Sequence, residues 1–257
     1  MAKVTGGEAI VQSLIAHGVD TVFGLPGVQN DHLFNAFYDN RDKIRVIHSR
    51  HEQGAAYMAL GYALSTDKVG VCSVVPGPGF LNASAALATA YSTNAKVLCL
   101  VGQIQSDSIN KGYGLLHEIP DQIGILKTLT KWAERIETAA DAPFLVAEAF
   151  RQLHSGRPRP VGLECAPDVL ATKAEVDLAR VDYTLRHPPV DMDKLAEAVD
   201  LLRKAKNPLI FVGLGAIDSA PAIQELAELL QAPVVSGVDA SHEVVERPAV
   251  PSRKGQP

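Results

Sequence analysis

Val69-Gly70-Val71-Cys72-Ser73-Val74-Val75-Pro76-Gly77-Pro78-Gly79 carries the clearest structural signal in the chain. Its first seven residues are nearly all apolar and rich in β-branched side chains, which is typical of a strand buried on both faces. The Pro-Gly-Pro-Gly sequence that follows must end this strand abruptly. Beyond it, the small apolar residues of 83–90 predict a closely packed helix, and 97–101 predicts another buried strand.

The same alternation of helix and strand extends in both directions from this stretch. Toward the N-terminus, we expect strands at 19–23 and 44–47, and helices at 8–16, 31–38 (capped by Asp31) and 55–64. Toward the C-terminus, we expect a helix at 144–153 and a strand at 160–164, then helices at 192–204 and 221–230 and strands at 208–212 and 233–235. Repeated β–α units imply parallel strands covered on both faces, so the fold class is α/β with a doubly wound parallel sheet.

Four segments follow from this pattern. We predict a first domain over residues 1–166, a linker over 167–190, a partial second domain over 191–237 and an irregular tail over 238–257. The second unit has two expected strands, too few to bury both faces of a sheet, so we expect it to be incomplete. Residues 103–124 are polar and too long for a simple connection, which is typical of functional or mobile loops.

Composition narrows the class of protein. The 257 residues carry a net charge of −5, and this gives no basic patch for a nucleic acid. No apolar run reaches the roughly 18–20 residues needed to cross a bilayer. Cys72, Cys99 and Cys165 are widely spaced within apolar stretches, which favours reduced, packed thiols. We therefore expect a cytoplasmic protein that binds neither nucleic acid nor a membrane and has no metal ligands of its own.

Arg50-His51-Glu52-Gln53-Gly54-Ala55 places a carboxylate where a strand gives way to a helix. Taken alone, Glu52 is most simply an acid that interacts favourably with the helix dipole. His48 and His51 lack the His-Glu-x-x-His order of a zinc helix. Pro76-Gly77-Pro78-Gly79 with Asn82 is likewise open to two interpretations: a rigid turn, or a loop whose glycines let the backbone approach a flat ligand.

Five motifs that occur together and in order favour the ligand-binding interpretation of Glu52 and of the Pro76–Gly79 loop. They are Gly24-Leu25-Pro26-Gly27, Arg50-His51-Glu52-Gln53-Gly54-Ala55, Met58-Ala59-Leu60-Gly61-Tyr62-Ala63, Pro76-Gly77-Pro78-Gly79 with Asn82, and Gly102-Gln103. The set resembles the pyrimidine-binding domain of the thiamine-diphosphate-dependent superfamily of acetolactate synthase, benzoylformate decarboxylase and pyruvate oxidase. The resemblance covers about residues 3–165. Residues 195–235 are similar to the start of that family's central domain, here an incomplete Rossmann-like unit.

The resemblance implies a cofactor and a set of residues that hold it. Thiamine diphosphate reacts as a carbanion at its thiazolium C2 and is itself the electron sink. In the family, a glutamate at the position of Glu52 hydrogen-bonds N1′ of the aminopyrimidine and thereby activates the cofactor. The positions that match the lining of the pyrimidine pocket are Pro26, Gly27, Val75, Pro78, Asn82 and Gln103. The implied activity is a transferase or lyase reaction, in which a 2-oxo acid is decarboxylated and the carbanion passes to an acceptor.

One segment departs from the family pattern, and another leaves open whether the central domain holds FAD. Leu116-His117-Glu118 matches a Phe-Gln-Glu of acetolactate synthases at positions that face the substrate, which puts acetolactate synthesis itself in doubt. His117 is a candidate to orient a carboxylate or donate a proton, and the alternative is an exposed loop histidine. Gly213-Leu214-Gly215 is a weak nucleotide signal, so FAD, which some relatives hold in this domain, is left open.

The sequence contains no Gly-Asp-Gly, the motif with which the family binds Mg²⁺ and the cofactor's diphosphate in a separate domain. Three interpretations follow. We expect first a truncated copy of a longer homodimeric or tetrameric carboligase or decarboxylase. The second is a separate subunit that needs a diphosphate-binding partner chain. The third is a non-catalytic remnant that acts as a binding or regulatory protein.

Overall fold

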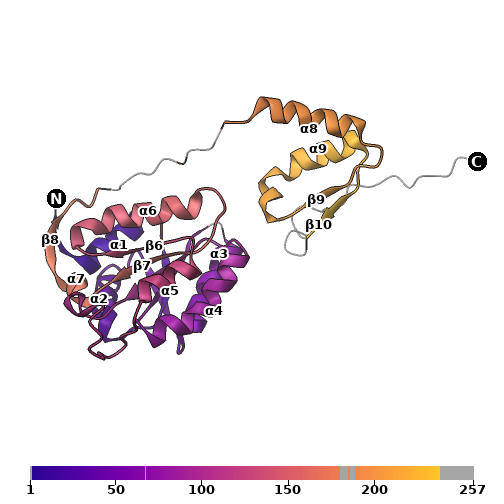
Figure 1. Ribbon diagram of the computed structural model, residues 1–257. Helices are drawn as coiled ribbons and strands as arrows, with labels where there is room; N and C mark the ends of the chain where they lie inside the picture. The colour runs from indigo at the N-terminus through magenta and orange to yellow at the C-terminus, as the bar shows by residue number, and fades with distance from the viewer. Residues whose placement is uncertain (1, 67, 180–184, 186–188, 238–257) are drawn as a thin grey trace, which may run out of the picture. The chain divides into compact units, whose positions relative to one another are not determined.

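The computed structural model describes residues 2–66, 68–179, 185 and 189–237 (Figure 1). The chain divides into two compact units, Met1–Arg186 and His187–Pro257. The irregular tail expected over 238–257 lies outside the described residues. No helix in the described part is long and apolar enough to span a membrane.

Within its described residues, the first unit contains a six-stranded sheet whose neighbours all pair in parallel. The strand order is β3-β2-β4-β5-β7-β6. The bounds are β2 (Thr21–Gly24), β3 (Arg45–His48), β4 (Gly70–Val74), β5 (Val97–Gly102), β6 (Trp132–Ile136) and β7 (Val161–Cys165). Every residue of β4, β5 and β7 is buried, as the apolar runs in the sequence require. The expected doubly wound parallel sheet is thereby confirmed.

Helices cover both faces of this sheet (Figure 1). On one face lie α1 (Gly6–Ala16), α2 (Asp31–Asp39), α6 (Ala142–His154) and the short α7 (Pro167–Ala171). On the other lie α3 (Glu52–Ser65), α4 (Pro78–Ser92) and α5 (Gln122–Leu129). Each face of the sheet has its own apolar core. Because the helices cover both faces, the loops that follow the strands lie together at the carboxyl ends of the strands.

The two small-residue helices pack as closely as the sequence predicts. The alanines on the inner faces of α3 and α4 are fully or almost fully buried against each other and the sheet: Ala55, Ala56, Ala59, Ala63, Ala83, Ala86 and Ala90. A Cβ placed on Gly70 would lie 2.0 Å from the carbonyl oxygen of Ala59, so the backbones of β4 and α3 are in direct contact there. Side chains any larger would push α3, and Glu52 at its start, away from the sheet.

Several boundaries differ from the sequence prediction. The helix α4 begins at Pro78 instead of 83, because proline at the first helical position lacks only an N–H that would be unpaired anyway. The helix α2 begins at Asp31, and Asn30 occupies the cap position expected for Asp31. The short α5 and β6 were not predicted, since they span only eight and five residues of a weak apolar pattern.

Part of the expected linker is ordered against the first unit. The helix α7 packs on α1, and β8 (Lys173–Val176) pairs antiparallel with β1 (Ala2–Thr5). The two strands have only four residues each and little alternation, which explains why their sequence was not recognised. Short 3₁₀ helices complete the unit at Val28–Asn30, Ser106–Ser108 and Ala139–Asp141.

The second unit shows the alternation expected for it. It contains α8 (Met192–Lys204), β9 (Ile210–Val212), a 3₁₀ helix at Leu214–Ser219, α9 (Ala220–Leu230) and β10 (Val234–Ser236). The strands β9 and β10 pair in parallel. Large apolar side chains such as Phe211 and Leu229 are 72% and 79% exposed, so this pair of strands does not bury a core of its own in the described residues.

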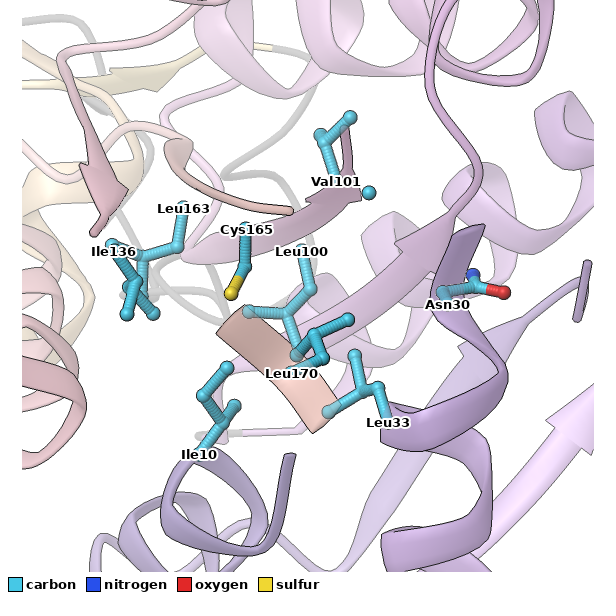
Figure 2. Close-up of a pocket in the computed structure, with 10 residues that line it drawn as sticks. Ile10, Asn30, Leu33, Leu100, Val101, Ile136, Leu163, Cys165 and Leu170 are labelled. Atoms are coloured by element: carbon cyan, nitrogen blue, oxygen red, sulfur yellow. The ribbon is translucent and has the colours of Figure 1, made fainter. Parts of the chain in front are cut away.

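A small cavity lies in the core on the α1 face of the sheet (Figure 2). Figure 2 shows the Cys165 sulfur among apolar side chains that include Ile10, Leu100 and Leu170. Burial raises the pKa of the Cys165 thiol, which keeps it protonated and unreactive. Cys72, Cys99 and Cys165 are all buried free thiols. The cavity is therefore a packing feature of the core and lies on the face opposite α3 and α4.

Candidate functional site

Glu52 is the first residue of α3 and stands at the carboxyl end of the sheet. The turn before it is fixed on both sides. The Ser49 amide donates to the carbonyl oxygen of Gly24 at 3.2 Å, and the Ser49 hydroxyl donates to that of His51 at 2.6 Å. His51 then caps the helix, because its Nδ1 accepts the amide of Gln53 at 3.2 Å. The strand end and the helix cap together fix where the Glu52 carboxylate lies.

The first turns of α4 lie against the Glu52 carboxylate. Asn82 Nδ2 donates to Glu52 Oε2 at 3.0 Å. A Cβ on Gly79 would lie 3.3 Å from Glu52 Oε1 and 2.5 Å from Val75 Cγ2, so only glycine leaves this space open. Glu52 is half-buried, and among the described residues no donor pairs with its Oε1. One carboxylate oxygen is thus oriented by Asn82 while the other stays available.

Gly27 approaches the same apolar side chain from the β2 side. A Cβ on Gly27 would lie 2.7 Å from Val75 Cγ1. The amide of Gly27 donates to Asn30 Oδ1 at 2.8 Å, which holds the turn that follows Pro26. Val75 is 7% exposed and lies between Gly27 and Gly79. The two sequence motifs therefore meet on one buried valine.

The turn at Gly77 connects this cluster to the long loop. Gly77 has a φ of +55°, and a Cβ there would lie 2.4 Å from the carbonyl oxygen of His117, so no other residue fits. The amide of Gly77 donates to Gln122 Oε1 at 2.8 Å. Its carbonyl accepts the amide of Leu81 at 2.9 Å and so begins the hydrogen bonding of α4.

His117 is held by a glutamine that the sequence did not single out. The imidazole Nδ1 lies 3.1 Å from Gln29 Oε1, and Gln29 Nε2 donates to the carbonyl oxygen of Leu116 at 3.2 Å. Because this second bond fixes which end of the Gln29 amide is oxygen, His117 Nδ1 is the donor. The neutral ring then carries its free acceptor on Nε2. His117 is half-buried and has a left-handed φ of +71°.

The remaining predicted positions are less tightly connected. Pro26 and Pro78 are exposed, and Pro78 occupies the first position of α4. Gln103 is 4% exposed, and its Oε1 accepts the amide of Ile104 at 2.7 Å, so its side chain folds onto its own backbone. No group of three or more potential metal ligands occurs in the part of the chain that the structure describes.

The arrangement fits the aminopyrimidine of thiamine diphosphate. A ring nitrogen needs a carboxylate with an available oxygen, and Glu52 Oε1 provides it. A flat ring needs apolar surface and close approach of the backbone, which Val75 and Gly79 provide. Gln29 and Gln122 had no distinct sequence signal, and Gly79 was identified only through its motif. The sequence placed Gly79 in a loop that is either a rigid turn or a surface for a flat ligand, without assigning it a role of its own, and the burial of the two glutamines depends on tertiary contacts.

Comparison with known proteins gives two family matches and several relatives. Residues 4–125 match the thiamine pyrophosphate enzyme, N-terminal TPP binding domain, and residues 195–247 match the thiamine pyrophosphate enzyme, central domain. The chain is 36% identical over 238 residues to a probable 2-ketoarginine decarboxylase of Pseudomonas aeruginosa, covering 91% of this chain and 42% of that protein. It is 38% identical over 248 residues to an acetolactate synthase of Arthrospira platensis, with the same coverage of each.

A third relative, the acetolactate synthase isozyme 2 large subunit of Escherichia coli, is 33% identical over 231 residues, or 89% of this chain and 40% of that protein. The chain thus spans about two-fifths of the length of these relatives. The matches give no support to the FAD site that the sequence left open. The chain matches two domains of one enzyme family and is more than 30% identical to these relatives over about nine-tenths of its length, which agrees with the parallel sheet of the first unit. The chain belongs to the thiamine-diphosphate-dependent enzyme superfamily that includes acetolactate synthase.

Proposed function

We propose that this chain supplies the pyrimidine-binding domain, and part of the central domain, of a thiamine-diphosphate-dependent enzyme that decarboxylates a 2-oxo acid and transfers the product carbanion to an acceptor. The observation that carries the proposal is the geometry of Glu52. Its Oε2 accepts Asn82 Nδ2 at 3.0 Å, and its Oε1 faces the space that Gly79 leaves open. A carboxylate oriented in this way is suited to hold or release a proton at a ring nitrogen.

Each predicted residue has a part in this proposal. Glu52 holds the proton at the pyrimidine nitrogen, and Asn82 keeps its carboxylate in place. Val75 and Gly27 provide the wall for the ring, and the exposed Pro26 and Pro78 border it. Gln103 supports the end of β5 through its bond to Ile104. The bound cofactor supplies the electron sink for decarboxylation.

His117 is proposed to face the substrate. With Nδ1 engaged by Gln29, the free Nε2 of the neutral ring can accept a proton or, once charged, donate one to a developing oxyanion or hold a carboxylate. Its backbone carbonyl lies against Gly77, so the same residue touches the loop that leads to Glu52. His117 thereby links the proposed substrate side to the cofactor side.

The names of two kinds of relative support the substrate class that we propose. One is named as a 2-ketoarginine decarboxylase and the others as acetolactate synthases. We therefore propose a 2-oxo acid as substrate, with decarboxylation as the common step. We place the diphosphate and Mg²⁺ in a region outside these 257 residues. That region belongs to a second copy of a longer polypeptide or to a partner chain, and the assembly is a dimer or tetramer in the cytoplasm.

The test is turnover of 2-oxo acids by the enzyme isolated from its native source. Wild type is compared with Glu52→Gln, which keeps the size of the side chain but cannot exchange a proton. The control is Glu134→Gln, which changes a half-exposed acid on β6. We expect product from pyruvate, benzoylformate or 2-ketoarginine with wild type and control, and none with Glu52→Gln. Turnover close to wild type in Glu52→Gln would remove Glu52 from the mechanism.

The intact mass of the isolated protein separates the three forms considered for the enzyme. A mass about twice that of this sequence supports the longer homo-oligomeric enzyme. A mass equal to this sequence, copurifying with a Gly-Asp-Gly chain, supports the two-subunit form. The same mass with no partner and no turnover contradicts the proposed activity and supports a binding or regulatory protein.

A further inference from the structure

Three strand ends converge on one buried side chain. Gln122, the first residue of α5, is 2% exposed. Its Oε1 accepts the amide of Gly77, which follows β4, and its Nε2 donates to the carbonyl oxygen of Gly102 at the end of β5, both at 2.8 Å. The same Nε2 donates to Glu164 Oε2 on β7, again at 2.8 Å. Both polar ends of this amide are therefore fully engaged.

A buried ion pair fixes the orientation of that amide. Glu164 is 0% exposed, and its Oε1 accepts Arg135 Nε at 2.6 Å, from the edge strand β6. The Arg135 side chain is 23% exposed and so keeps contact with solvent. Turning the Gln122 amide over would oppose its oxygen to the Glu164 carboxylate and its NH₂ to the Gly77 amide. The Arg135–Glu164–Gln122 network thus has one arrangement in which every member is satisfied.

The network reaches Gly77, at the start of α4, and the next residues of α4 contact the Glu52 carboxylate. Gly77 accepts the amide of Leu81 and starts α4. The first turns of α4 carry Gly79, which borders the Glu52 carboxylate, and Asn82, which donates to it. A shift of Gly77 would therefore move both groups that define the position of Glu52. Because a buried N–H that loses its partner carries a large desolvation cost, Gly77 stays where the Gln122 oxygen is.

We infer that Gln122, held in orientation by Glu164 and Arg135, is a positioning residue for Glu52 and Asn82. It touches neither the carboxylate nor the cofactor, and acts by fixing Gly77 at the start of α4. The part of the inference that concerns cofactor binding rests on the proposed function. The part that concerns the Asn82–Glu52 contact stands on the geometry alone.

The test uses the full 257-residue chain and a pair of matched substitutions on α5. Gln122→Met keeps the length and volume of the side chain but removes all three hydrogen bonds. Lys127→Met introduces the same side chain at a half-exposed position of α5, where it removes only the contact of 3.4 Å with Glu134. NMR reports the exchange rate of the Gly77 amide and the chemical shifts of the Asn82 side-chain NH₂. Titration with thiamine, the cofactor without its diphosphate, reports the affinity of the site.

In Gln122→Met we expect Gly77 amide exchange to accelerate about tenfold or more and the Asn82 NH₂ resonances to lose their distinct shifts. We expect thiamine affinity to fall by about the same factor. Lys127→Met should leave all three readouts at their wild-type values. A folded Gln122→Met with unchanged Asn82 shifts and unchanged thiamine affinity would overturn the inference, because Gln122 would then be merely structural.

Two further measurements keep the two proposals apart. If Gln122→Met does not fold, Arg135→Met, at the partly exposed end of the network, is measured in its place. A smaller change of the same sign at Gly77 and Asn82 supports the inference, and no change contradicts it. If wild type shows no binding of thiamine, the proposed role of this chain in holding the aminopyrimidine is contradicted. The Gly77 and Asn82 readouts still decide the role of Gln122.

Discussion

Replacing Gly79 with alanine tests whether the space beside Glu52 is as tight as the structure indicates. The new Cβ would lie 2.5 Å from Val75 Cγ2, on a buried β-branched side chain with little rotamer freedom, and 3.3 Å from Glu52 Oε1. Overpacking of this kind costs about 1–3 kcal/mol, while alanine gains up to about 1 kcal/mol over glycine in a helix. With the full helix-propensity gain, the net expectation is a loss of about 0–2 kcal/mol of unfolding free energy.

Gly61→Ala is the matched control in the middle of α3. Nothing lies within 4 Å of a Cβ placed there, and the position is exposed. The substitution should therefore stabilise the protein by about 0.5–1 kcal/mol through helix propensity alone. Urea unfolding gives both values, and thermal unfolding should separate the two variants by about 2–4 °C for each kcal/mol. A Gly79→Ala protein as stable as Gly61→Ala would refute the close packing of α4 on Glu52 and Val75.

Three further predictions concern single contacts. The hydrogen bond from Lys68 lowers the pKa of Asp20, so Lys68→Met should raise the pKa of Asp20 toward its ordinary value, which NMR titration with and without salt measures. Because the pKa is lowered in the folded protein, the stability that this pair contributes is present above the ordinary pKa of aspartate and is lost as the pH falls through the lowered pKa. Gln29→Met should shift neutral His117 from the Nδ1–H to the Nε2–H tautomer in long-range ¹⁵N spectra, and an Nε2–H tautomer already present in wild type would contradict the assignment. Thr5→Ala removes the side chain that caps α1 and should cost about 1 kcal/mol in urea unfolding, whereas no loss would mean that the capping box contributes nothing.

The long periodic segments of this fold were predictable because burial and periodicity agree in them. The strand at 69–75 and the small-residue helices are identified by composition alone, and the structure places them as β4, α3 and α4. The boundaries near glycine and proline were not predictable to the residue. Pro78 begins a helix where the sequence suggested a loop, since the same residue is compatible with both.

Short secondary-structure elements and buried polar contacts could not be predicted from the sequence. The pair β1–β8 joins residues about 170 positions apart, and four-residue strands carry too little pattern to be recognised. Glu52 was identified because its whole motif is distinctive. Gln122 and Gln29 were not, because a glutamine in a polar segment gives no sign that the fold will bury it and satisfy both ends of its amide.

The most direct test of the account is a titration of the isotopically labelled chain with thiamine, followed at the amides of Glu52 and Gly79 and at the Asn82 side chain. We predict that thiamine shifts these resonances in wild type. In Glu52→Ala its affinity should fall by about tenfold or more, because a hydrogen bond to a charged group contributes about 1.5–3 kcal/mol. Shifts that are absent in wild type, or that are equally strong in Glu52→Ala, would contradict the claim that Glu52 binds the cofactor's aminopyrimidine.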